Sequence, residues 1–294
     1  MNLKSILRHI SILGAAFLSL FFLDSCATYG IQKGKKLKTV ESTANSDDNS
    51  FKMFLVGDAG NADELQSQQT LDFLKTKLDA AGKNSMLIFL GDNIYPSGMP
   101  PENEKDYELA KTKMENQLKI AENFRGKTLV IPGNHDWYHG LNGLKAQENF
   151  VENYLKKKNV FLPENACPID DIDLTENIKL IVIDSEWYLT DWNKSYGINK
   201  NCNIKTREDF FTALEEEIKK NQDKTIVVAL HHPVISSGNH AGFDSFKSHI
   251  YPFKGKIPLP IISSGLNILR KTSGATTVDL SNVHYAELAA RIKN

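Results

Sequence analysis

The sequence predicts an α/β fold with a largely parallel sheet at its core. From Phe51 onward, short apolar runs alternate with segments of helical periodicity, which is the pattern of strands alternating with helices. Four of these runs end at a short polar segment that contains aspartate, asparagine or histidine, as expected where a buried strand turns at its carboxyl end. With 294 residues, 41% of them hydrophobic, the chain can form one large domain or two small ones.

The expected elements follow from the spacing of apolar residues. Buried strands are predicted over 51–56, 86–90, 128–131, 178–183 and 225–230. Helices are predicted from Leu65 to Leu78, and over 107–121, 149–156, 206–218 and 279–293. Asn61 with Glu64, and Thr206 with Asp209, have the spacing of a capping box at a helix start. Prolines and a glycine predict a loop over 252–260.

The first 26 residues have the pattern of an export signal. Lys4 and Arg8 precede an apolar stretch over 10–23, which matches a secretory signal peptide. The following Leu-Asp-Ser-Cys, ending at Cys26, resembles the lipobox of bacterial lipoproteins, in which the cysteine is lipidated and becomes the first mature residue. A transmembrane anchor is the alternative, but the stretch is shorter than the roughly 20 residues that a membrane span needs. We therefore expect an extracytoplasmic, lipid-anchored protein of the cell envelope, periplasmic or on the outer membrane.

The rest of the chain divides into a tether and one folded domain. Residues 27–50 are polar and rich in Ser, Asn, Asp and Lys, so they cannot bury a core and are expected to link the membrane to the domain at 51–294. Lysine and arginine number 35 against 36 acidic residues, a balance that argues against a nucleic-acid partner. In an exported protein Cys167 and Cys202 are expected to form a disulfide that joins the loops around strand 178–183, with two free thiols as the alternative.

Side chains that bind metal follow the expected strands. Asp58, Asp92, Asn134 and His231 each lie just after one of them, and Tyr95 follows Asp92 by three residues. The carboxyl ends of strands in an α/β sheet lie along one edge, where ligands bind. Carboxylate, phenol, amide and imidazole ligands together suit a pair of divalent or trivalent ions.

Four motifs in this order resemble a known family. They are Gly57-Asp58-Ala59-Gly60, Gly91-Asp92-Asn93-Ile94-Tyr95, Gly133-Asn134-His135-Asp136 and His231-His232-Pro233. Each motif alone is common in ordinary turns. The series, however, resembles the calcineurin-like metallophosphoesterases, in particular the purple acid phosphatase branch. That branch has the motifs GDxG, GDxxY and GNH[DE], followed by a histidine at a strand end. The resemblance implies a layered α/β/β/α fold around a central β-sandwich.

The resemblance also implies a metal-ligand set. Asp58 would bind the first metal and Asp92 would bridge both metals. Tyr95 would bind the first metal as a phenolate, a ligand that accompanies ferric iron in that branch. Asn134 and His231 would bind the second metal. The expected cofactors are two ions, Fe3+ with Fe2+, Zn2+ or Mn2+.

The same resemblance implies hydrolysis of a phosphate-ester substrate in the manner of an acid phosphatase, by a hydroxide bound to the metal pair. His135 would face the substrate, where it could protonate the leaving alkoxide or hold a phosphate oxygen, and the adjacent Asp136 could accept its other ring proton. His240 resembles the second substrate-facing histidine of the branch. His232 is expected to have a structural role.

The sequence departs from the family pattern at its end. The closing GHxH, which supplies one ligand to each metal, is absent after His240, and no strand follows the helix expected over 279–293. We therefore expect a domain that is incomplete at its C-terminus and, in isolation, weak in metal binding or inactive. Two alternatives remain open: a non-catalytic, lipid-anchored binding protein with an incomplete metal site, and a phosphodiesterase acting on nucleotides or lipid headgroups.

Overall fold

The computed structural model describes residues 50–192, 197, 198, 200, 202–252 and 257–293. These fall into two compact units that meet in the sequence between Pro233 and Val234. Cys26 and the signal, lipobox and tether segments lie outside the described residues, so those assignments stay predictions. Within the described ranges no helix combines the length and the apolar character needed to cross a bilayer.

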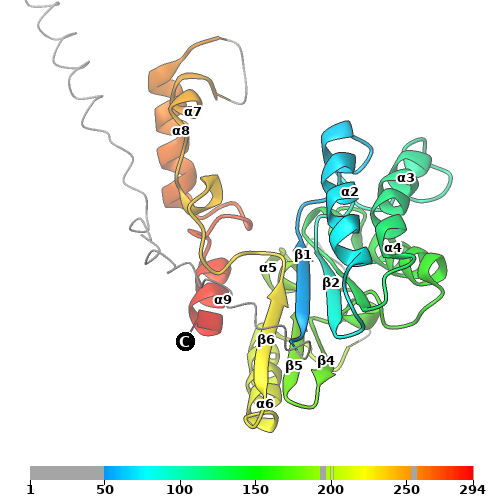
Figure 1. Cartoon of the computed structure of the whole chain (residues 1–294). Coiled ribbons are helices and arrows are strands. Elements are labelled where there is room, and N and C mark those ends of the chain that lie inside the picture. The colour runs from blue at the N-terminus through cyan, green and yellow to red at the C-terminus, as the bar shows by residue number, and fades with distance from the viewer. Residues whose placement is uncertain (1–49, 193–196, 199, 201, 253–256, 294) are drawn as a thin grey trace, which may run out of the picture. The chain divides into compact units, whose positions relative to one another are not determined.

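The first unit begins with a three-stranded parallel sheet in the order β1-β2-β3. Its strands β1 and β2 lie side by side in Figure 1. Its strands span Lys52–Val56, Ser85–Leu90 and Lys127–Ile131. The helices that connect these strands span Leu65–Asp79 (α2) and Tyr107–Leu118 (α3), and Gly140–Leu155 (α4) follows β3. Parallel strands need such crossover connections, which explains why strands and helices alternate along the sequence.

A second three-stranded sheet, in the order β4-β5-β6, completes the first unit. Its strands span Ile169–Thr175, Ile178–Ile183 and Thr225–Leu230, with helices α5 (Ser185–Leu189) and α6 (Arg207–Lys220) between β5 and β6. β4 and β5 form an antiparallel hairpin, whereas β5 and β6 are parallel. A disulfide joins Cys167, just before β4, to Cys202, with Cα atoms 5.5 Å apart, a usual separation for such a bond.

The two sheets pack face to face and form the expected central sandwich. Alternate residues of the central strands belong to one buried cluster, with Met86 and Ile88 from β2 and Leu180 and Val182 from β5. The intervening residues, such as Phe89, are also fully buried. Successive side chains of a strand point to opposite faces, so helices must cover the outer faces as well. This burial on both faces is why the strands are nearly continuous apolar runs.

All five expected strands are confirmed, each within one residue of its expected start. The sequence reasoning missed β4, because Ile-Asp-Asp-Ile-Asp-Leu-Thr carries three aspartates. The capping box at Thr206 and Asp209 is present. The one at Asn61 and Glu64 was wrong: α2 begins at Leu65 with Glu64 at its N-cap and no side-chain cap. There the N–H of Glu64 bonds instead to the main-chain oxygen of Asn61 in a turn.

The described part of the second unit includes the α-helices α7 (Phe246–Ile250), α8 (Pro260–Ser273) and α9 (Val283–Lys293). The first two were not predicted. α9 begins at Val283 and not near Asp279, because the side-chain oxygen of Asn282 accepts the N–H of His284 at 3.0 Å. Leu288 of this helix is fully buried, whereas Val283 is exposed.

Candidate metal centre and active site

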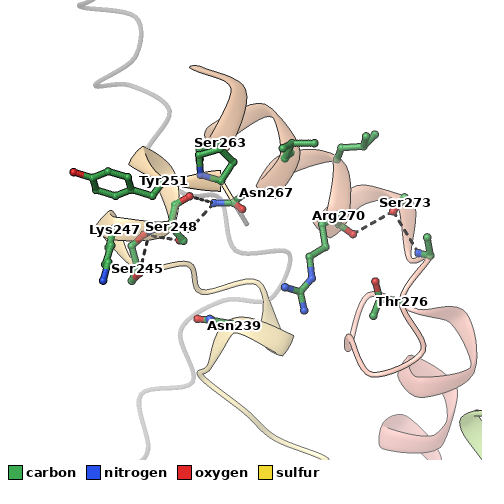
Figure 2. A pocket seen from close by; sticks show the side chains of 14 residues that line it. Asn239, Ser245, Lys247, Ser248, Tyr251, Ser263, Asn267, Arg270, Ser273 and Thr276 are labelled. Carbon is green, nitrogen blue, oxygen red and sulfur yellow. Dashed lines mark hydrogen bonds between the residues drawn. The ribbon is translucent and has the colours of Figure 1, made fainter. Parts of the chain in front are cut away.

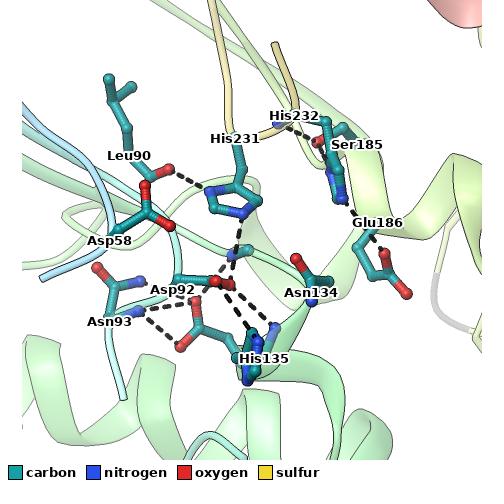
Figure 3. A network of polar contacts seen from close by, with 12 residues as sticks. Asp58, Leu90, Asp92, Asn93, Asn134, His135, Ser185, Glu186, His231 and His232 are labelled. Atoms are coloured by element: carbon teal, nitrogen blue, oxygen red, sulfur yellow. Dashed lines mark hydrogen bonds and ion pairs between the residues drawn. The ribbon is translucent and has the colours of Figure 1, made fainter. Parts of the chain in front are cut away.

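Three side chains that could hold a metal ion converge at the carboxyl end of the strands (Figure 3). Asp58, Asp92 and His231 each place one ligand atom within 4.8 Å of the others. They follow β1, β2 and β6, so both sheets contribute. Asp58 and Asp92 have φ angles of 57° and 53°, in the left-handed region that reverses the chain sharply after a strand. The fold therefore holds both aspartates in an unfavourable backbone conformation, and this brings their carboxylates together.

The turn after β2 leaves no space for a side chain at Gly91. This residue has a φ of 89°, and a Cβ there would lie 2.7 Å from both the nitrogen of Gly133 and Nδ1 of His231. Glycine is thus required where the turns after β2 and β3 meet His231.

The His231 ring is fixed in a tautomer that suits metal binding. Its Nδ1 lies 2.8 Å from the main-chain oxygen of Leu90, a group that can only accept a hydrogen bond. Nδ1 therefore carries the proton of the neutral ring, and Nε2 is left with its lone pair. Nε2 lies 3.4 Å from Oδ1 of Asp92, so the lone pair faces the acidic pair. A partner that sets the tautomer in this way is typical of histidines that bind metal.

Asn134 lies at the same edge, buried, at the end of the turn after β3. Its Nδ2 donates to the hydroxyl of Tyr138 at 2.9 Å, which leaves its amide oxygen as the group available to a cation. Its role as a metal ligand stays a prediction.

Tyr95 also reaches the acidic pair. Its hydroxyl donates to Oδ1 of Asp58 at 2.8 Å. Burial, together with the Asp92 and Asp58 carboxylates, raises the pKa of Tyr95 well above its usual value. The phenol thus stays protonated beside these carboxylates alone, and a cation would be needed to stabilise the phenolate.

His135 points its ring toward the same centre. Its main-chain N–H donates to Oδ1 of Asp92 at 3.0 Å, and its Nε2 lies 3.9 Å from Oδ2 of Asp92. Its Nδ1 contacts the main-chain oxygen of Pro96. The ring is held by Pro96 on one side and presents Nε2 to the metal-binding edge on the other.

The expected contact between Asp136 and the His135 ring is wrong, because the carbonyl of Pro96 takes that proton. Asp136 is fully buried and accepts hydrogen bonds from the N–H of Gly133 (2.8 Å), from Asn93 and from Gln147. Burial raises the pKa of Asp136 to about 6, although the Gly133 hydrogen bond opposes the rise. Asp136 therefore ties the turn after β3 to the turn after β2, and acts on the site through the backbone.

A second buried polar group lies next to His231. Oγ of Ser185 accepts the main-chain N–H of His232 at 3.2 Å and lies 2.8 Å from Nδ1 of the same ring. Nε2 of His232 lies 3.9 Å from Oε2 of Glu186. These contacts agree with the structural role expected of His232. Ser185 is fully buried. Glu186 carries no motif signal, and sequence reasoning missed it.

His240 belongs to the second unit, where Asp279 and Arg270 surround it. Nδ1 of His240 lies 2.9 Å from Oδ1 of Asp279, and Arg270 donates to both oxygens of the same carboxylate at 2.6 Å. Burial alone would raise the pKa of Asp279, but hydrogen bonds from His240 and Arg270 lower it. His240 is thus oriented from one side, and its imidazole remains largely exposed. A cavity of about 1120 Å³ lies in the same unit, lined by hydroxyl and amide side chains of α7 and α8 together with Arg270 (Figure 2).

The arrangement of the first unit agrees with a family match. A model of the calcineurin-like phosphoesterase family matches residues 51–264. The chain belongs to the calcineurin-like phosphoesterase family. The match contains both sheets and every predicted metal ligand, and this membership indicates metal-dependent phosphoesterase chemistry. A search of curated proteins gives no significant match.

Proposed function

We propose that this calcineurin-like phosphoesterase is a phosphatase of the purple acid phosphatase type, which uses two metal ions. The observation that carries the proposal is the cluster of Asp58, Asp92 and His231, whose ligand atoms lie within 4.8 Å of one another. Two carboxylates and a neutral imidazole form a donor set suited to a divalent or trivalent transition-metal ion.

The side chains around this cluster support two further points of the proposal, a second metal ion and iron at the first site. Asn134 offers an amide oxygen, and Asp92 is central enough to contact both His231 and the His135 backbone. The Tyr95 hydroxyl at Asp58 supports a phenolate ligand for Fe3+ at the first site, with Fe2+, Zn2+ or Mn2+ at the second. Such a metal pair activates a water molecule and neutralises charge on the phosphate.

The remaining roles belong to side chains of this chain. His135 holds Nε2 toward the centre while Pro96 binds its Nδ1, so a protonated ring can donate from Nε2 to the leaving alkoxide. Asp136 keeps the turn that carries Asn134 and His135 in place. His240 is proposed as a second substrate-facing histidine, oriented by Asp279.

A substrate test decides between a phosphatase and a phosphodiesterase. The full-length, iron- and zinc-loaded protein is expected to hydrolyse p-nitrophenyl phosphate in preference to bis(p-nitrophenyl) phosphate. Removing metal with a chelator should abolish hydrolysis, and adding metal back should restore it. Preferential turnover of the diester would instead favour the phosphodiesterase, and failure to hydrolyse either ester would favour a binding protein.

We further propose that the protein is an extracytoplasmic lipoprotein anchored through Cys26. The Leu-Asp-Ser-Cys segment supports this, and the Cys167–Cys202 disulfide supports an oxidising compartment. Metabolic labelling with a fatty acid is expected to mark the wild type and not Cys26→Ala. Equal labelling of the two would contradict the anchor.

A further inference from the structure

A cavity of about 720 Å³ lies beside the candidate metal centre, within the first unit. Trp137, Tyr138 and Asn142, from the segment after β3, line one side, and Glu186 and Thr190, from α5 and its end, line another. The cavity adjoins the predicted metal ligands through Tyr138, whose hydroxyl accepts a hydrogen bond from Asn134. The Tyr138 ring also contacts the His135 ring, with centroids 4.6 Å apart.

Glu186 is an unusual residue for the lining of this cavity, because it is an ionisable side chain that is almost fully buried. Its side chain is only 8% exposed, and its Oε2 has no hydrogen-bond partner among the described residues. The Oε2 atom lies 3.9 Å from Nε2 of His232, which is beyond hydrogen-bond range. Burial, and then the neighbouring Asp184, raise the pKa of Glu186 to about 8. The surrounding protein therefore leaves part of the bonding capacity of this carboxyl unused.

Helix stability does not require a carboxyl group at this position. Asp184 already caps α5, since its Oδ1 accepts the N–H of Trp187 at 3.1 Å. The following residues, Trp187 to Leu189, are fully buried. An apolar side chain at position 186 would avoid the cost of burying an ionisable group with an unsatisfied oxygen.

We propose that this cavity binds the alcohol part of the phosphate ester and that Glu186 selects alcohols that carry a hydrogen-bond donor, either a hydroxyl or an amine. The inference rests on the proposed function, because it places the phosphate at the metal centre. Trp137 and Tyr138 offer aromatic surface to the carbon chain of such an alcohol, and Glu186 accepts its donor group. Lys200, which is exposed, also borders the cavity and would repel an amine, so the donor belongs at the Glu186 end.

Three phosphonates of equal chain length test this directly. They are propylphosphonate, 2-hydroxyethylphosphonate and 2-aminoethylphosphonate, which differ only in the terminal methyl, hydroxyl or amine. Calorimetric titration of the metal-loaded, full-length protein needs no turnover. Above pH 8, where Glu186 is ionised, the wild type is expected to bind at least one donor-bearing phosphonate about tenfold or more tightly than propylphosphonate, the usual effect of a hydrogen bond to a charged group. Whether the hydroxyl or the amine compound binds better identifies the class of alcohol.

Substitutions at Glu186 assign the preference to this residue. Glu186→Leu should bind the three phosphonates with affinities equal to within about twofold. Glu186→Gln keeps the shape of the side chain and serves as the test if the leucine variant does not fold. Its preference for 2-aminoethylphosphonate over propylphosphonate should fall about tenfold. Its preference for 2-hydroxyethylphosphonate should fall less, because the amide oxygen still accepts a hydrogen bond. Glu215→Gln, which removes an exposed carboxylate of α6, is the matched control and should behave as the wild type.

Equal binding of the three phosphonates by the wild type would overturn the inference, as would a preference that survives both Glu186 substitutions. Either result would leave the proposed phosphatase function intact, provided that p-nitrophenyl phosphate is still hydrolysed. If the protein neither bound any phosphonate nor hydrolysed any ester, both proposals would be overturned.

Discussion

His231 donates its Nδ1 proton to the main-chain oxygen of Leu90, 2.8 Å away, and thereby turns Nε2 toward Asp92. This single bond links the end of β6 to the end of β2 and so connects the two sheets at the candidate metal centre. It also selects the tautomer in which Nε2 can bind a cation. The site is thus organised by the backbone of the fold as well as by the ligands themselves.

Replacing His231 by alanine is expected to weaken metal binding by more than about 100-fold, because it removes a ligand that is already oriented. Metal affinity is measured by competition with a chromophoric chelator. His249→Ala is the control, since His249 lies in the second unit and has no predicted metal role. Equal affinities of the two variants would contradict the assignment of His231.

His135→Ala is expected to retain its metals and to lose activity by about 10²–10⁴, the usual contribution of general acid catalysis. The loss should shrink for esters with very good leaving groups, which need little protonation. Metal content by mass spectrometry and kcat for aryl and alkyl phosphates test both points. If metal and activity fell in proportion, His135 would be a ligand.

Tyr95→Phe removes the hydroxyl that donates to Asp58. In the iron-loaded protein this change is expected to remove the visible absorption of a tyrosinate–Fe3+ pair and to weaken binding at the first site, while the second ion is retained. The visible spectrum and the metal content are the measurements. An unchanged spectrum would show that Tyr95 does not bind iron.

The buried Glu186 predicts how stability depends on pH. Its folded pKa of about 8 lies above the ordinary 4.5, so its contribution to the free energy of unfolding is present below pH 4.5 and is lost as the pH rises through 8. Each unit of pKa difference corresponds to about 1.4 kcal/mol. In denaturant unfolding of the metal-free protein, the free energy of unfolding should fall less between pH 5 and pH 8 for Glu186→Gln than for the wild type. Equal losses would contradict this.

Much of the fold could be predicted from the sequence, because the central strands are buried on both faces and are therefore continuous apolar runs. β4 could not, since it lies at the edge of its sheet and its aspartates resemble loop composition. α7 and α8 were missed as well; α8 exposes Ile261 and Leu269, so its apolar residues mark no obvious core-facing stripe.

The convergence of the side chains at the candidate metal centre could be predicted because each directly follows a strand, as Asp58 and His231 do. The partners that orient them could not. Leu90 and Pro96 act through main-chain oxygens, which no sequence motif records. Asp136 was misassigned for a related reason: adjacency to His135 suggested a contact, but the chain turns its carboxylate toward the N–H of Gly133.

The central claim is that Asp92 holds the metal on which phosphate-ester hydrolysis depends. The most direct test is the metal content and p-nitrophenyl phosphate turnover of full-length Asp92→Ala, measured beside the wild type after both are stripped with a chelator and reloaded with iron and zinc. The wild type should regain metal and activity, and the variant should regain neither. Wild-type metal content or turnover in Asp92→Ala would contradict the claim.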